Sequence, residues 1–105
     1  MDEILQELRE LGIEVDSIGG AAPLQIWGRI DGCWFYFRAR WGAWEFCLSE
    51  SAASVEDVAR LTLKATGVGN FYYSGNANSE TSPEPDEGLA ILLRCAAAYR
   101  CSYRG

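Results

Sequence analysis

The sequence predicts an α+β fold: an N-terminal helix, an antiparallel β-meander of three to five strands, and two C-terminal helices packed on the sheet. Three observations predict it. Apolar residues recur at helical spacing near the N-terminus, alternate with polar residues through the centre, and return to helical spacing in the C-terminal half. A chain of 105 residues with an apolar fraction of 49% supports one hydrophobic core. We therefore expect a single domain over residues 1–105.

Residues 2–11 are predicted to form the first helix. Ile4, Leu8 and Leu11 recur at intervals of four and three, which places them in one apolar stripe. Gly12 follows, at a position where a left-handed cap costs little. The helix is therefore expected to bury one side and to end at Gly12.

Four runs of alternating apolar and polar residues are predicted as strands, at residues 13–18, 24–30, 33–40 and 43–49. Asp31-Gly32 between two such runs is a strong signal for a tight hairpin. With two-residue turns at 31–32 and 41–42, Phe37 stands opposite both Ile26 and Phe46. A slip of one residue would bring polar side chains onto this apolar face, so the pattern specifies the register.

This register divides the ribbon into two faces. The inner face carries large apolar side chains, among them Phe35, Phe37, Trp44 and Phe46, and needs no ligand to explain it. The outer face carries three large rings and three guanidinium groups: Trp27, Arg29, Trp34, Tyr36, Arg38 and Arg40. One interpretation is that a helix or the arginine stems cover these rings. The other is a surface for a protein partner, since Trp, Tyr and Arg dominate binding energies at interfaces.

The C-terminal half is predicted to supply two helices and a short strand. Ser54 is a suitable N-cap for a helix over 55–66, and residues 69–75 resemble a short strand. A polar segment at about 74–85 is expected to be a mobile loop. The last helix, over 86–101, is apolar nearly all round and is expected to be largely buried. We expect both helices on the inner face.

Charge and composition exclude several functions. The net charge is −6, which should repel nucleic acid and anionic membranes and attract basic protein surfaces. The absence of histidine excludes His-assisted nucleophilic catalysis and His-containing metal sites. Four cysteines without a Cys-x-x-Cys pair indicate reduced thiols, with a disulfide framework as the lesser alternative. We expect a cytoplasmic protein that is not an enzyme and has no cofactor and no metal.

The first helix also carries an acidic stripe. Glu3, Glu7 and Glu10 recur at intervals of four and three and flank the apolar stripe. Successive carboxylates would be roughly 5–6 Å apart along the helix axis, the same order as phosphates along a nucleic-acid strand. The plain interpretation is a solvated helix face. The functional one is a mimic of phosphates that binds a groove lined by lysine and arginine.

The stretch "GRIDGCWFYFRARWGAWEF" resembles hairpins of small phage and prophage proteins. In size, acidity and lack of catalytic motifs the chain is also similar to anti-CRISPR proteins as a class, which share no sequence motif, so no functional residue carries over. The resemblance implies a non-enzymatic inhibitor that binds a basic nucleic-acid-binding surface of a host protein, such as a CRISPR effector complex. The alternative is a small protein-interaction or homodimerisation module, so the chain would be a monomer or a homodimer.

Overall fold

The structure, a computed structural model, describes residues 2–20, 24–40, 42–59, 70–76 and 85–104. The described elements are three helices and five strands. In chain order they are α1 (Asp2–Glu10), β1 (Ile13–Gly19), β2 (Leu24–Ile30), β3 (Cys33–Arg40), β4 (Ala43–Ser49), α2 (Val55–Ala59), β5 (Asn70–Asn76) and α3 (Pro85–Arg104).

The five strands form one antiparallel sheet in the order β1-β2-β3-β4-β5. The predicted α+β class, the antiparallel sheet and its upper limit of five strands are confirmed. The register of both central hairpins is also as predicted: Phe37 pairs with Ile26 on one side and with Phe46 on the other. The first turn has positive φ at both central residues, 51° at Asp31 and 85° at Gly32, as a two-residue hairpin of matching twist requires.

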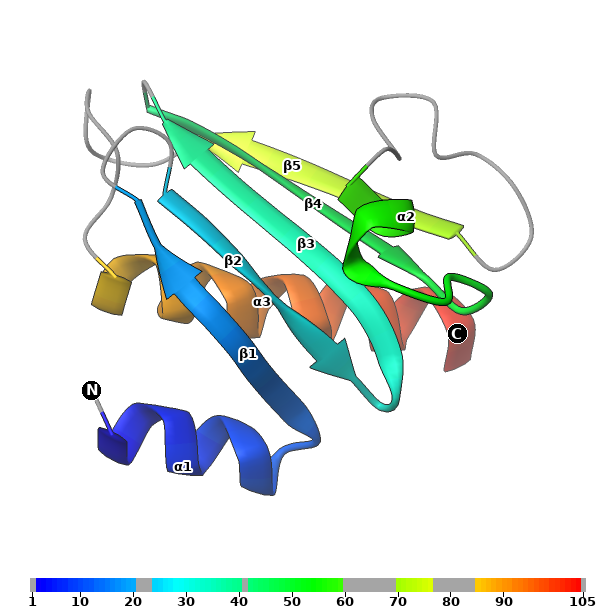
Figure 1. The fold of residues 1–105 in the computed structure, drawn as a ribbon, viewed down its shortest axis with the longest axis horizontal. Helices are drawn as coiled ribbons and strands as arrows, with labels where there is room; N and C mark the ends of the chain where they lie inside the picture. The colour runs from blue at the N-terminus through cyan, green and yellow to red at the C-terminus, as the bar shows by residue number, and fades with distance from the viewer. Residues whose placement is uncertain (1, 21–23, 41, 60–69, 77–84, 105) are drawn as a thin grey trace.

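The core lies on the inner face of the sheet. Apolar side chains from β2, β3 and β4 are fully buried there, and they meet apolar residues of α3. Helix α3 crosses behind the sheet in Figure 1, and α1 contacts both β1 and α3. Leu8 of α1 and Leu92 of α3 belong to the same buried cluster, so the two helices share one layer.

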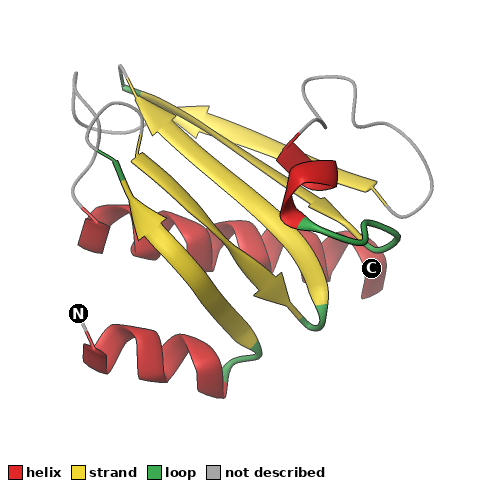
Figure 2. Ribbon diagram, in the orientation of Figure 1, coloured by secondary structure: helices red, strands yellow, loops and turns green. Residues whose placement is uncertain are grey.

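Helix α2 corrects the predicted arrangement. It lies on the outer face, opposite α3, and packs against β3 and β4 (Figure 2). Its residue Val58 is fully buried yet stands outside the core cluster of the inner face. The prediction of two helices on the inner face was therefore wrong for α2. Helical periodicity shows that a helix has an apolar side but not which sheet face that side contacts, and both faces of this sheet carry large apolar side chains.

The remaining boundaries differ in detail. The second helix is described only as far as Ala59, and the rest of the predicted 55–66 lies outside the described residues. The strand predicted over residues 69–75 is observed as β5, which includes the start of the loop predicted at about 74–85. Most of that loop lies outside the described residues. Helix α3 is not buried all round, since Leu93 is 39% exposed and Ala90 and Ala97 are exposed as well. Its exposed side faces away from the sheet, because one layer covers the core.

Candidate protein-binding surface

The outer face is built from cross-strand rows of side chains, which the register defines. One row runs through Trp27, Tyr36, Cys47 and Tyr72, and the next runs through Arg29, Trp34, Ser49 and Asn70. A third runs through Gln25, Arg38, Glu45 and Ser74. The sheet thus brings five of the six predicted outer-face residues together on β2 and β3. The sixth, Arg40, pairs through its backbone with Ala43, and its side chain lies outside the described part of the chain.

The three large rings of the outer face are half-buried. Trp27 and Tyr36 face each other across β2 and β3, with ring centroids 6.4 Å apart. Burial raises the pKa of Tyr36, and the nearby Arg38 partly offsets this. The phenol therefore stays neutral at physiological pH. Each ring is only partly exposed, which leaves a smaller contact area than a fully exposed patch would have.

Arg29 is held by its neighbours on the sheet. Its Nη2 atom is 2.8 Å from a carboxylate oxygen of Glu14 and 3.6 Å from one of Asp16, both on β1. Its guanidinium carbon lies 5.3 Å from the ring centroid of Trp34, in cation–π geometry. A partner would have to compete with these contacts. Arg38 is exposed and forms no ion pair with a described residue, whereas Arg29 is held by two carboxylates.

Helix α2 shields part of the outer face. Val58 is fully buried, and Cys47 in the central row is 7% exposed. Burial raises the pKa of the Cys47 thiol to about 12, with a smaller contribution from Glu45, so this thiol is neutral and unreactive at physiological pH. The outer face is therefore neither fully open nor fully covered. This result lies between the two interpretations of the sequence, a covered face and a free surface for a protein partner.

The acidic stripe is on the opposite layer. Glu3, Glu7 and Glu10 are all exposed on α1, and no ion pair of theirs is found among the described side chains. Because α1 packs with α3 and β1, while α2 packs on the outer face, the stripe and the aromatic rows do not form one surface. A single groove on a partner protein would therefore contact either the acidic stripe or the aromatic rows, but not both.

An open pocket of about 450 Å³ lies at one end of the outer face. Its lining is Arg38, Ala43, Trp44, Glu45, Tyr72, Ser74, Gly75 and Asn76. The phenol of Tyr72 donates a hydrogen bond of 3.0 Å to Oε2 of Glu45. The register that the two predicted turns define places Arg38 opposite Glu45, as observed. The pocket was not predicted, because the strand over residues 69–75 had no assigned neighbour.

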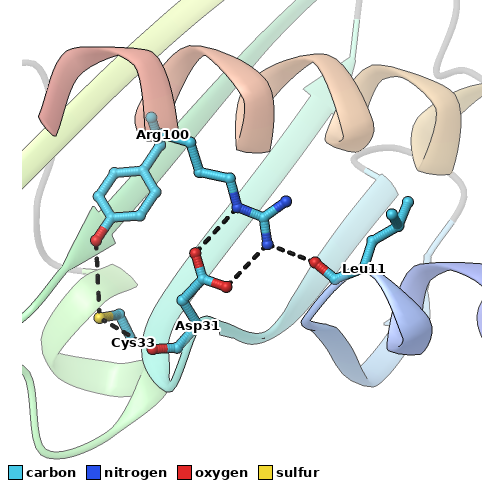
Figure 3. Close-up of polar contacts among 5 residues, drawn as sticks. Leu11, Asp31, Cys33 and Arg100 are labelled. Atoms are coloured by element: carbon cyan, nitrogen blue, oxygen red, sulfur yellow. Dashed lines mark hydrogen bonds and ion pairs between the residues drawn. The ribbon is translucent and has the colours of Figure 1, made fainter. Parts of the chain in front are cut away.

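A second polar cluster lies where α3 meets the first hairpin turn (Figure 3). Arg100 donates to both carboxylate oxygens of Asp31, at 3.0 Å from Nε and 2.9 Å from Nη2, and Nη2 also donates to the carbonyl of Leu11. Beside it, the Tyr99 hydroxyl lies 3.9 Å from the Cys33 sulfur and donates to Glu50 at 3.3 Å. Burial and these neighbours raise the pKa of Tyr99. The cluster joins the residue that follows α1, the hairpin turn and α3.

Among the described residues, no group of three or more cysteine, aspartate or glutamate side chains is placed to hold a metal ion. Among the helices the structure describes, none combines the length and apolarity needed to cross a membrane. Comparison of the chain with protein-family models, with curated proteins and with solved structures found no match.

Proposed function

We propose that this protein is a small, non-enzymatic inhibitor of the anti-CRISPR type, which acts in the cytoplasm by binding a basic nucleic-acid-binding surface of a host effector complex. The observation that carries the proposal is the exposed acidic stripe of α1. Its three glutamates, Glu3, Glu7 and Glu10, are free of described ion pairs, so their charge is available to a partner.

The position of α1 supports this role. The helix lies at one edge of the molecule beside β1, so a partner can reach its acidic side without displacing the sheet (Figure 1). Leu8 is 1% exposed and anchors the opposite side of the helix in the core, which orients the acidic side outward. A rigid row of carboxylates loses little conformational entropy on binding a lysine- and arginine-lined groove.

The outer face contributes less to this proposal than the sequence suggested. Trp27, Trp34 and Tyr36 are half-buried and Arg29 is engaged with Glu14 and Asp16. Arg38 is exposed but has the same sign as the proposed target surface. We therefore assign these residues to a secondary contact at most and place the main contact on α1.

The proposal is tested by measuring binding to purified CRISPR effector complexes with and without target DNA. We expect the intact protein to bind the complex when target DNA is absent. Added target DNA should displace the protein from the complex. Reversing Glu3, Glu7 and Glu10 to lysine should abolish binding, and raising the salt concentration should weaken it. As a control, the variant Glu56→Gln with Asp86→Asn, which removes exposed acids elsewhere, should bind normally. Absence of binding across representative effectors, or equal binding by the reversed variant, contradicts the proposal.

A homodimerisation module is the second candidate, and the exposed side of α3 favours it. Leu93 is 39% exposed between Ala90 and Ala97, which are small enough for close helix packing. Sedimentation over a range of concentrations should show a dimer that Leu93→Glu dissociates. The variant Trp34→Ala distinguishes this arrangement from a dimer through the outer face of the sheet: it should dissociate a dimer through the outer face and leave a dimer through α3 intact. A monomer at all concentrations contradicts both arrangements.

A further inference from the structure

The pocket at the end of the outer face brings groups of both charges together. Three of its lining residues form one cross-strand row, in which Arg38 of β3 stands opposite Glu45 of β4 and Glu45 stands opposite Ser74 of β5. Tyr72 lines one side. The volume of about 450 Å³ lies in the range of small-molecule sites, roughly 300–1,000 Å³.

The two charges of the pocket do not neutralise each other. Arg38 and Glu45 are cross-strand partners, a position where opposite charges commonly pair. Yet no ion pair within 4.0 Å joins them; Glu45 instead accepts the hydrogen bond of Tyr72, 3.0 Å long. Arg38 is exposed and forms no ion pair with a described residue. The pocket therefore presents an unneutralised cation beside an anion that a phenol holds in place.

Tyr72 is suited to hold Glu45. Burial and the hydrogen bond to Glu45 raise the pKa of Tyr72, so its phenol keeps the proton that it donates. One Glu45 oxygen is occupied in this way, and the other remains free to accept from a ligand. The carboxylate is thus oriented before any ligand arrives, which reduces the entropy lost on binding.

We propose that this pocket binds a small zwitterion, with its anionic group on Arg38 and its cationic group on Glu45. A ligand with only one charge would gain one contact and meet repulsion from the group of like sign. A zwitterion satisfies both groups, and an α-amino acid carries its two charged groups close together on a body small enough for the pocket. Ser74 and Asn76 add polar groups to the lining. This site does not depend on the acidic stripe of α1.

The test is a titration of the full-length protein with glycine, L-valine and L-phenylalanine, followed by the amide NMR signals of Ser74, Asn76 and Ala43. We expect saturable shifts confined to the pocket for at least one amino acid below about 10 mM. Either Arg38→Gln or Glu45→Gln should weaken binding at least roughly tenfold, the loss expected for one hydrogen bond to a charged group. Tyr72→Phe should weaken it less, because Glu45 is retained.

Two controls distinguish a zwitterion site from binding to any exposed arginine and from binding of any singly charged ligand. Arg94→Gln removes an exposed arginine from α3 and should leave binding unchanged. Acetate and methylammonium, each with one of the two charges, should bind at least roughly tenfold more weakly than the best amino acid. The proposal is overturned by an absence of shifts for all three amino acids, by equal binding of acetate, or by unchanged affinity in both charge variants.

Discussion

Gly28 of β2 lies against the backbone of β1, where no side chain fits. A Cβ atom at this position would be 2.9 Å from the backbone nitrogen of Asp16 and closer still to the carbonyl oxygen of Glu14. The close approach occurs where the β1–β2 register shifts between Val15 and Ser17, as at a β-bulge. Because the obstructing atoms are backbone, a new side chain could not push them aside without disturbing the pairing of β1.

Gly28→Ala is therefore expected to destabilise the fold by about 1–3 kcal/mol or more, the usual cost of overpacking. Urea unfolding followed by tryptophan fluorescence measures it. The matched control is Gly19→Ala in β1, where nothing lies within 4 Å of an added Cβ and φ is not positive. This control should be neutral or slightly stabilising. Equal stability of the two variants would show that β1 moves to accommodate the methyl group.

Arg100 is the second residue with a measurable structural role. Its guanidinium joins Asp31 and the carbonyl of Leu11 with three donated hydrogen bonds, and its side chain is 27% exposed (Figure 3). Because of that exposure we expect Arg100→Ala to cost only about 1–2 kcal/mol in thermal or urea unfolding. Arg100→Lys should recover less than half of the loss, since an ammonium group cannot reproduce the planar fork. Arg94→Ala, on the exposed side of the same helix, should change stability by less than about 0.5 kcal/mol. Full recovery by lysine would mean that charge alone matters.

Helix α2 shows what a short element requires at its start. The backbone nitrogen of Asp57 donates to Oγ of Ser54 at 3.4 Å, and Oδ2 of Asp57 accepts from the backbone of Ala53 at 3.3 Å. These contacts satisfy two amides near the start of a helix described over only five residues. The Ser54 cap was predicted from the sequence, and the contact confirms it.

Ser54→Ala should destabilise α2 locally by about 1 kcal/mol. Amide hydrogen exchange should then be roughly fivefold faster in α2, while β3 and the inner core stay protected. Ser54→Asp keeps an oxygen acceptor at the same position and should exchange like the unaltered protein. Unchanged exchange in Ser54→Ala would indicate that the packing of Val58, rather than the cap, holds the helix.

At the scale of the whole molecule, buried thiols link stability to pH. Burial raises the pKa of Cys47 and Cys95 from 9.0 to about 12. Below pH 9 both thiols are protonated in the folded and the unfolded chain, so their full contribution to the free energy of unfolding is present. Between pH 9 and 12 the unfolded chain releases these protons while the folded chain keeps them, so stability falls as pH rises.

We expect the free energy of unfolding to drop by about 1 kcal/mol per buried thiol between pH 8 and 9.5. Urea titrations at the two pH values measure the drop, and Cys47→Ala with Cys95→Ala should remove most of it. Cys101→Ser, at an exposed position, should not. The tyrosines with raised pKa, Tyr36, Tyr72 and Tyr99, add to the loss at higher pH, which is why the comparison stops at 9.5. An equal drop in the double variant would assign the effect to other groups.

The candidate surfaces could be predicted only in part. The sequence indicated which residues share a strand face, because side chains alternate along a strand and the register follows from the turns. It did not indicate how exposed that face is. Trp34 and Tyr36 are half-buried because α2 packs on their side of the sheet, and Arg29 is engaged because β1 brings Glu14 beside it. The pocket required β5 to pair with β4, a contact between segments separated by α2 and further residues.

By itself, the sequence determined the α+β class, the two central hairpins with their register, the cap of α2 and the acidic side of α1. Each of these follows from neighbours along the chain, where periodicity and turn chemistry act directly. Only the tertiary structure decided which sheet face α2 covers, which side of α3 remains exposed, and that Arg38, Glu45 and Tyr72 line one pocket. Those outcomes depend on contacts between distant segments, and local patterns specify an apolar side without naming the surface that it packs against.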